Sequence, residues 1–336
     1  MRAQVIHRHG GIEELTLERD WPTPEPGPGE VVLKVGACAL NYHDIFTLHG
    51  MPGIKVPMPI IMGIDLAGEI AALGPGVAGW RPGDRVVIDP IERTKGKLQG
   101  EMMDGGLAEY CKVTAAQLVR LPEEIDFASA AALPCAYGTA YRMMLTRGQV
   151  TAGETVLVLG ASGGVGTCCV QLGRMVGAHV IAAASSEDKL EKLRALGADE
   201  GLNYAEEDFM AQIHARHGKP RIWGEGGVDV VVNFTGGDTW VPALRSLKKG
   251  GRMLTCGATA GYDPKTDLRF IWTFEQTILG SNGWQTEDIS ALLELVQAGK
   301  LRPAVQEPLP LAETPEAFRQ LEERRFFGKI VIDPRL

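Results

Sequence analysis

The sequence predicts an α/β protein in which a doubly wound parallel sheet is joined to a compact, mainly β unit. Three observations support this prediction. Strand-like and helix-like segments alternate after residue 126, a glycine-rich turn joins one of these strands to a helix, and the chain before residue 127 is rich in turns without long helical periodicity. Such alternation is typical of parallel sheets with helices on both faces.

The second half of the chain contains five apolar runs that predict buried strands. Their near-continuous Val and Leu content fits burial on both faces of a parallel sheet. The expected strands are 155–159, 179–184, 228–233, 252–256 and 277–280, and the expected helices are 167–176, 187–196 and 241–247. An alanine-rich helical run, 128–144, precedes them and contains Pro134.

The turn after the first of these strands reads Gly-Ala-Ser-Gly-Gly-Val-Gly over residues 160–166. Glycines at these spacings allow a tight turn, close approach of a pyrophosphate, and close packing of helix on strand. The helix N-terminus then offers N–H groups and a positive dipole end to the anion. We therefore expect a Rossmann dinucleotide site, with these cofactor-binding candidates: Gly160, Ser162, Gly163, Gly164, Val165 and Gly166.

The first half predicts short strands at 31–35, 66–73 and 85–88, separated by Pro/Gly turns. A last strand, 328–332, is expected to return and pair with this β unit. We therefore place one domain at 1–126 with 303–336, and the cofactor-binding domain at 127–302.

Composition excludes several classes of function. The chain is 45% hydrophobic with a net charge of −8, which disfavours binding to nucleic acid or anionic membrane. No apolar run reaches the roughly 18 residues needed to span a bilayer. The polar N-terminus does not resemble a signal peptide, so we expect a cytoplasmic protein. Six scattered cysteines without a Cys-x-x-Cys pair predict buried thiols rather than disulfides.

The end of the second strand indicates which dinucleotide binds. An acidic residue there favours NAD, because it binds the 2′-hydroxyl and repels a 2′-phosphate. Here the position is Ser186, preceded by Ser185 and followed one turn later by Lys189, which suits a phosphate. Glu187 and Asp188 complicate this interpretation unless they face solvent as first-turn helix residues. We expect NADPH, with NADH as the alternative.

Several short sequence motifs, taken in their order along the chain, resemble those of the medium-chain dehydrogenase/reductase superfamily. They are Asn41–Asp44, the Met-Gly-Ile-Asp-Leu-Ala-Gly of 62–68, the Pro-Gly-Asp-Arg-Val of 82–86, Ala108–Tyr110, the glycine turn, the Leu-Gly-Ala-Asp of 196–199 and Asn203-Tyr204. The resemblance covers the whole chain and implies a GroES-like catalytic domain, a Rossmann domain and an active site in the cleft between them. The Gly-Gly-Val-Gly form is similar to the zinc-free quinone oxidoreductase branch.

The resemblance also assigns residues to the cofactor. In that branch a Ser/Lys pair and the Tyr of an Asn-Tyr dipeptide bind the 2′-phosphate, and Ser185, Lys189 and Tyr204 match them. Thr139 resembles a nicotinamide contact, with a plain helix-start role as the alternative. Lys329 is a candidate for the cofactor phosphates, with a solvated lysine as the alternative.

The zinc ligands of the related alcohol dehydrogenases are mostly missing. Asn41 and Ile64 stand where the resemblance expects Cys and His, and Cys135 alone survives. A catalytic zinc normally takes three protein ligands, so we expect no metal. A rearranged site has the ligand types but no recognisable spacing; its members would be Cys38, His43, His49, Asp65 and Cys135.

Without a Lewis acid, hydride addition to a conjugated acceptor is easier than ketone reduction, because the enolate needs only hydrogen-bond donors. Asn41, Tyr42 and His43 are the catalytic candidates, and a histidine is a strong enough acid near neutral pH. We expect NADPH-dependent reduction of a quinone or α,β-unsaturated carbonyl. The alternatives are a zinc-type alcohol dehydrogenase and a non-catalytic NADPH-binding protein. The resemblance implies a homodimer or homotetramer acting on a small molecule.

Overall fold

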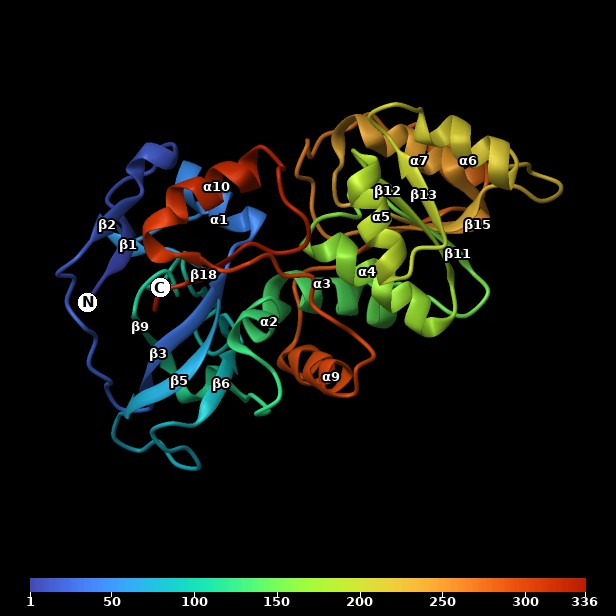
Figure 1. Cartoon of the computed structure of the whole chain (residues 1–336). Helices are drawn as coiled ribbons and strands as arrows, with labels where there is room; N and C mark the ends of the chain where they lie inside the picture. Colours follow the sequence, from blue (N-terminus) through green and yellow to red (C-terminus); the bar gives the residue numbers. More distant parts are fainter. The chain divides into compact units, whose positions relative to one another are not determined.

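The computed structural model describes all 336 residues, which form two compact units (Figure 1). Unit 1 comprises residues 1–136 and 286–336, and unit 2 comprises residues 137–285. The sequence placed the boundaries at 126/127 and 302/303. Helix α9 (Thr286–Gln297) therefore lies in unit 1 and not with the dinucleotide-binding part.

Unit 2 contains the predicted doubly wound sheet. Six parallel strands lie in the order β13-β12-β11-β14-β15-β16, which is the Rossmann order. The strands are β11 (Thr155–Val158), β12 (His179–Ala184), β13 (Glu200–Asn203), β14 (Val228–Val232), β15 (Leu247–Thr255) and β16 (Thr277–Gly280). Those at 179–184 and 277–280 match the predicted bounds, and β13 is a strand that the sequence analysis missed.

Helices cover both faces of this sheet. They are α3 (Gly138–Tyr141), α4 (Gly164–Val176), α5 (Glu187–Leu196), α6 (Phe209–His217), α7 (Trp240–Ser246) and α8 (Leu268–Thr273). Leu157, Ile181 and Val231 pack against α6 and α7. The side chains of neighbouring residues along each strand point to the opposite face of the sheet. On that face Val180 packs closely against α4 at Gly173. Figure 1 shows α4 and α5 together and α6 and α7 together.

Unit 1 is built on a seven-stranded sheet in the order β10-β6-β5-β3-β18-β17, with β9 also paired to β3. Its strands are β3 (Glu30–Ala39), β5 (Asp65–Leu73), β6 (Arg85–Ile88), β9 (Tyr110–Thr114), β10 (Leu118–Arg120), β17 (Leu309–Pro310) and β18 (Val331–Asp333). A second sheet joins β1 (Ala3–Ile6), β2 (Thr16–Glu18) and β4 (Ile60–Ile61), and β7 (Ile91–Glu92) pairs with β8 (Lys97–Leu98).

The C-terminal strand returns to unit 1 as predicted, because β18 pairs antiparallel with β3. Beside it, α1 (Tyr42–His49) and α10 (Thr314–Glu322) share one apolar core in which Leu48 and Phe318 are fully buried. In Figure 1 the red helix α10 lies next to the blue helix α1. This contact packs α1 against α10.

The helical run predicted at 128–144 is present but irregular. It begins as α2 (Phe127–Ala131), widens to a π-turn at Leu133–Tyr137, continues as α3 and ends in a second π-turn at Arg142–Arg147. Pro134 has no N–H to donate, which explains a local departure from the α-helical ladder at the first π-turn. No helix in the structure has the length and apolar character of a membrane span.

Candidate active site

The glycine turn of unit 2 has the geometry that a phosphate site needs. Gly160 adopts a left-handed backbone with φ of 65°. At Gly166 an added Cβ would lie 2.5 Å from the Ala161 Cα, so only glycine fits between helix and turn. At Gly163 an added Cβ would meet nothing closer than 3.7 Å, so the protein itself does not explain why this residue lacks a side chain. Space kept for a ligand does explain it.

Helix α4 begins at Gly164, three residues earlier than the sequence indicated. Its N-cap is Gly163, and no side chain caps this end. The first-turn N–H groups of such a helix are without intrahelical partners. Gly163, Gly164 and Val165 are partly exposed, whereas Ser162 is buried. This end of α4 therefore presents backbone donors to an anion.

The residues predicted to hold a 2′-phosphate come together at the carboxyl edge of the sheet. Ala184 at the end of β12 lies opposite Asn203 at the end of β13, so Ser185 and Tyr204 directly follow the ends of adjacent strands. Ser186 is the N-cap of α5, and its Oγ accepts a hydrogen bond from the N–H of Lys189 at 3.4 Å. Lys189 thus lies in the first turn of α5.

Lys189 is unfavourably placed for a cation. Burial lowers the pKa of its ammonium group, with the charge of Asp188 opposing this. The positive end of the helix dipole also disfavours a lysine in the first turn. Glu187 and Asp188 are exposed, as the NADPH interpretation required. A bound phosphate would relieve the unfavourable position of Lys189.

Thr139 lies in α3 and is 8% exposed. The sequence offered a nicotinamide contact or a helix-start role for it. Its neighbour Gly138 packs against Trp284, since an added Cβ there would lie 2.9 Å from the Trp284 Cβ. Thr139 is therefore fixed in a close-packed part of unit 2.

Unit 1 contains a buried polar cluster that connects three distant segments. The Asn41 amide donates to Asp65 Oδ2 at 2.9 Å and to the Ala39 carbonyl at 3.4 Å, and its Oδ1 accepts from Lys329 Nζ at 2.5 Å. Lys329 Nζ also lies 3.5 Å from Asp65 Oδ2. Asp65 Oδ1 accepts the N–H of Cys135 at 3.0 Å. The cluster pairs one buried cation with one buried anion.

This cluster changes two of the assignments made from sequence. The Lys329 residue is only 3% exposed and its ammonium is bound to Asn41 and Asp65, so it belongs to this cluster rather than to the cofactor phosphates. Both amide hydrogens of Asn41 are engaged within the protein. In this structure neither amide hydrogen of Asn41 is left for a substrate carbonyl.

His43 makes a contact that the sequence analysis missed. Its Nε2 lies 2.5 Å from Oε2 of Glu101, a residue that is 2% exposed, while the His43 side chain is about one-third exposed. Burial lowers the pKa of His43, but the hydrogen bond and charge of Glu101 and the charge of Asp44 outweigh it, so the pKa is raised above 6.5. No spacing links these residues in the sequence.

The start of α1 holds His43 in place. The backbone N–H of Asn41 donates to Asp44 Oδ2 at 2.7 Å, which is half of a capping box and a signal that could have revealed this helix. Asp44 is fully buried, and its Oδ1 has no hydrogen-bond partner. Burial raises the pKa of Asp44 to about 7. Tyr42 packs edge-to-face on Phe46 with ring centroids 5.3 Å apart.

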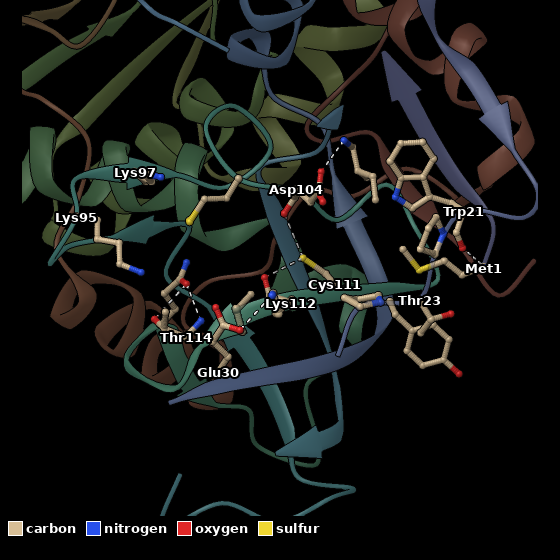
Figure 2. A pocket seen from close by; sticks show the side chains of 17 residues that line it. Met1, Trp21, Thr23, Glu30, Lys95, Lys97, Asp104, Cys111, Lys112 and Thr114 are labelled. Atoms are coloured by element: carbon tan, nitrogen blue, oxygen red, sulfur yellow. Dashed lines mark hydrogen bonds and ion pairs between the residues drawn. The ribbon is translucent and has the colours of Figure 1, made fainter. Parts of the chain in front are cut away.

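A separate pocket of about 440 Å³ lies in unit 1, as Figure 2 shows. Trp21, Asp104 and Tyr110 line it together with Lys95 and Lys112. None of the residues predicted for catalysis or cofactor binding lines this pocket. It is therefore distinct from the Asn41 cluster and from the glycine turn.

Comparisons with known proteins identify the family of this chain. Residues 27–123 match the model of the alcohol dehydrogenase GroES-like domain, and residues 164–298 match that of the zinc-binding dehydrogenase domain. The chain is 33% identical over 338 residues to the chloroplastic NADPH-dependent alkenal/one oxidoreductase of Arabidopsis thaliana, covering 99% of this chain and 80% of that protein. It is 30% identical over 325 residues to human quinone oxidoreductase, covering 96% and 94%.

This chain belongs to the medium-chain dehydrogenase/reductase superfamily. Within it, the chain is an oxidoreductase similar to the quinone oxidoreductases. A crystal structure of an NAD-dependent alcohol dehydrogenase has the same fold, with a TM-score of 0.90, 37% identity and 99% coverage of both chains. The predicted fold class is confirmed.

The zinc position of this superfamily can be tested against the residues present. Ile64 is 1% exposed and offers no ligand atom, and the Asn41 amide is engaged by Asp65 and Lys329. A buried ammonium already neutralises Asp65 and would repel a divalent cation there. These residues do not fit a catalytic zinc ion. The rearranged set suggested by the sequence does not gather either, because the single group of three possible ligands lies elsewhere.

Proposed function

We propose that this medium-chain enzyme is an NADPH-dependent reductase of quinones or α,β-unsaturated carbonyl compounds that works without zinc. One observation supports this above the others. Where zinc ligands are expected, Lys329 forms a buried contact with Asn41 and Asp65, and at the start of the following helix His43 is paired with Glu101. The site therefore offers a proton donor and no Lewis acid.

The cofactor would be held by unit 2. When bound, NADPH supplies a hydride. The backbone of Gly163–Val165 would bind the pyrophosphate, while Ser185, Lys189 and Tyr204 would bind the 2′-phosphate. The Arabidopsis relative is named NADPH-dependent, and the structure at 37% identity is named NAD-dependent. We favour NADPH because the half-buried Lys189 at the start of α5 lies beside Ser185 and Ser186, a combination of cation and hydroxyl groups that suits a phosphate.

The proton would come from His43. Its raised pKa keeps the imidazolium populated near neutral pH, where it can donate to the oxygen or α-carbon of an enolate. Glu101 orients the ring and holds that charge, and Tyr42 is a second hydrogen-bond donor. Reduction of a simple ketone would require stabilisation of an alkoxide, for which this site has no metal ligands.

A substrate panel tests the proposal. NADPH oxidation is measured with quinones, enones, enoyl thioesters and saturated aldehydes, and alcohol oxidation is measured with and without added zinc after chelator treatment. We expect turnover of the conjugated acceptors without metal. Zinc-dependent turnover of simple alcohols would instead establish the alcohol dehydrogenase alternative. NADPH binding without oxidation across the panel would support the non-catalytic alternative.

The role of His43 is tested by the pH profile of kcat. Because the reactive form is protonated, kcat should fall as pH rises through the His43 pKa, which lies above 6.5. Glu101→Gln removes the charge that raises this pKa and should move the midpoint to lower pH. Glu322→Gln is the control. Glu322 lies 3.0 Å from His49, which is on the same helix as His43, so this variant removes a carboxylate from a different histidine. An unmoved midpoint in Glu101→Gln would remove His43 as the donor.

We also propose a homodimer formed through the edge of the unit 2 sheet. Strand β16 pairs only with β15, so its other side presents unpaired backbone groups, and Ile278 on it is 37% exposed. Trp272 of α8 is 65% exposed. An exposed edge strand with apolar residues is a template for pairing with another chain. Thr277→Pro should yield a monomer by light scattering, whereas an unchanged mass would place the interface elsewhere.

A further inference from the structure

Two histidines and a glutamate meet at the amino-terminal edge of the unit 2 sheet. His179 is the first residue of β12, Glu200 is the first residue of β13, and His217 is the last residue of α6. The dinucleotide candidates lie at the opposite edge. Ala184 is five residues along β12 from His179, which is about 16 Å at ~3.3 Å per residue. The cluster is thus independent of the proposed active site.

Both imidazoles point an Nε2 atom at the same carboxylate oxygen. His179 Nε2 lies 2.7 Å from Glu200 Oε1, and His217 Nε2 lies 3.0 Å from it. The three ligand atoms lie within 4.8 Å of one another. The two rings have centroids 6.0 Å apart and are tilted by 55°, so they are not stacked. This is a convergent set of ligand atoms drawn from three elements.

Hydrogen bonding within the cluster is incomplete. His179 makes a hydrogen bond to Glu200, but the Nε2 atom of His217 is buried and makes none, although it is close to the same oxygen. The second oxygen of Glu200 faces Arg216 at 3.4 Å, which leaves Oε1 to the histidines. Asp199 Oδ2 lies 3.7 Å from Nδ1 of His179, where metal-bound histidines commonly have a carboxylate.

We propose that His179, Glu200 and His217 bind one divalent transition-metal ion of the zinc class. Imidazole nitrogens with one carboxylate suit Zn²⁺, Ni²⁺ or Cu²⁺ and do not suit Mg²⁺ or Ca²⁺. In a tetrahedral site with ligand bonds of about 2.05 Å, ligand atoms are roughly 3.3 Å apart. The two nitrogen–oxygen distances of 2.7 and 3.0 Å would therefore have to open by roughly 0.6 and 0.3 Å. The fourth position would hold water.

Such an ion would tie the end of α6 to two strands and stabilise unit 2. The test uses the full chain after chelator treatment, titrated with ZnCl₂ by calorimetry and followed by thermal unfolding. We expect one equivalent of Zn²⁺ to bind and the melting temperature to rise, with no such effect of Mg²⁺. His217→Asn should weaken the affinity by about 100-fold or more, since outer partners alone account for 10- to 100-fold.

The control is His7→Asn. His7 and Glu18 form an exposed pair in unit 1 at 3.2 Å without a third ligand, so this change should leave Zn²⁺ affinity unaltered. Glu200→Gln is a second variant, and circular dichroism with NADPH binding shows that each variant is folded. Absence of saturable binding below about 100 μM, or equal affinity in His217→Asn and wild type, would overturn the proposal.

Discussion

Replacing Lys189 by glutamine should separate NADPH from NADH. In the structure Lys189 is half-buried in the first turn of α5, where burial lowers its pKa and the helix dipole opposes its charge. In the absence of a ligand the lysine is therefore not at a favourable position. A phosphate carrying nearly two negative charges would stabilise the ammonium group through a charge-assisted hydrogen bond.

The size of the effect follows from that contact. A hydrogen bond to a charged group contributes about 1.5–3 kcal/mol. Because Lys189 is partly exposed to solvent, which screens its charge, we take a range of about 1–3 kcal/mol. At 1.4 kcal/mol per factor of ten, Lys189→Gln should weaken NADPH binding by about 5- to 150-fold. NADH, which has no 2′-phosphate, should lose about twofold or less in affinity.

Lys192 provides the matched control. It lies on the same helix one turn further along, is more exposed than Lys189, and its Nζ is paired with Asp188 at 2.8 Å. Lys192→Gln should change neither affinity appreciably, because an exposed pair of this kind contributes little. The dissociation constants of both cofactors are measured by calorimetry at low and moderate salt, and the NADPH advantage should shrink as salt rises.

Two results would refute this reasoning. Equal losses of NADPH and NADH affinity in Lys189→Gln would mean that the lysine contributes to the binding of both cofactors and does not specifically bind the 2′-phosphate. A loss in Lys192→Gln as large as that in Lys189→Gln would mean that the overall charge of the helix decides the affinity, and not one contact.

Three further predictions follow from the geometry. Gly163→Ala should change the melting temperature by no more than a few degrees and weaken NADPH binding at least tenfold. Gly166→Ala should instead lose about 1–3 kcal/mol of folding stability, because its Cβ would meet backbone atoms at 2.5 Å. Calorimetry of NADPH binding and thermal unfolding distinguish the two variants. Lys329→Met should destabilise the fold by about 3–5 kcal/mol in urea unfolding by leaving Asp65 unpaired, and adding Asp65→Asn should recover most of this; no recovery would contradict the ion pair. Because the pKa of Asp44 is about 7 in the folded state against 3.8 ordinarily, stability should fall as pH rises from about 3.8 to 7, and Asp44→Asn should flatten that part of the curve.

The sequence alone predicted the features that depend on local pattern. Glycine at 160, 163 and 166 predicted the dinucleotide-binding turn, because backbone freedom is a local property. The alternation of strands and helices predicted the parallel sheet, because hydrophobic period is also local. The register of the sheet places Ser185 and Tyr204 directly after the ends of two adjacent strands. The loss of zinc ligands at Asn41 and Ile64 was likewise visible from residue type.

Only the tertiary structure decided the partners of buried charges. Lys329 reaches Asn41 across 288 positions of sequence because β18 pairs with β3, and no periodicity encodes that pairing. Glu101 meets His43 from a turn 58 positions away in the sequence. His179 and His217 converge on one glutamate because α6 ends at the sheet edge where β12 and β13 begin. A buried charged side chain needs an oppositely charged or hydrogen-bonding partner, but that partner can come from any part of the sequence. Which partner it finds is therefore decided by the fold and not by spacing along the chain.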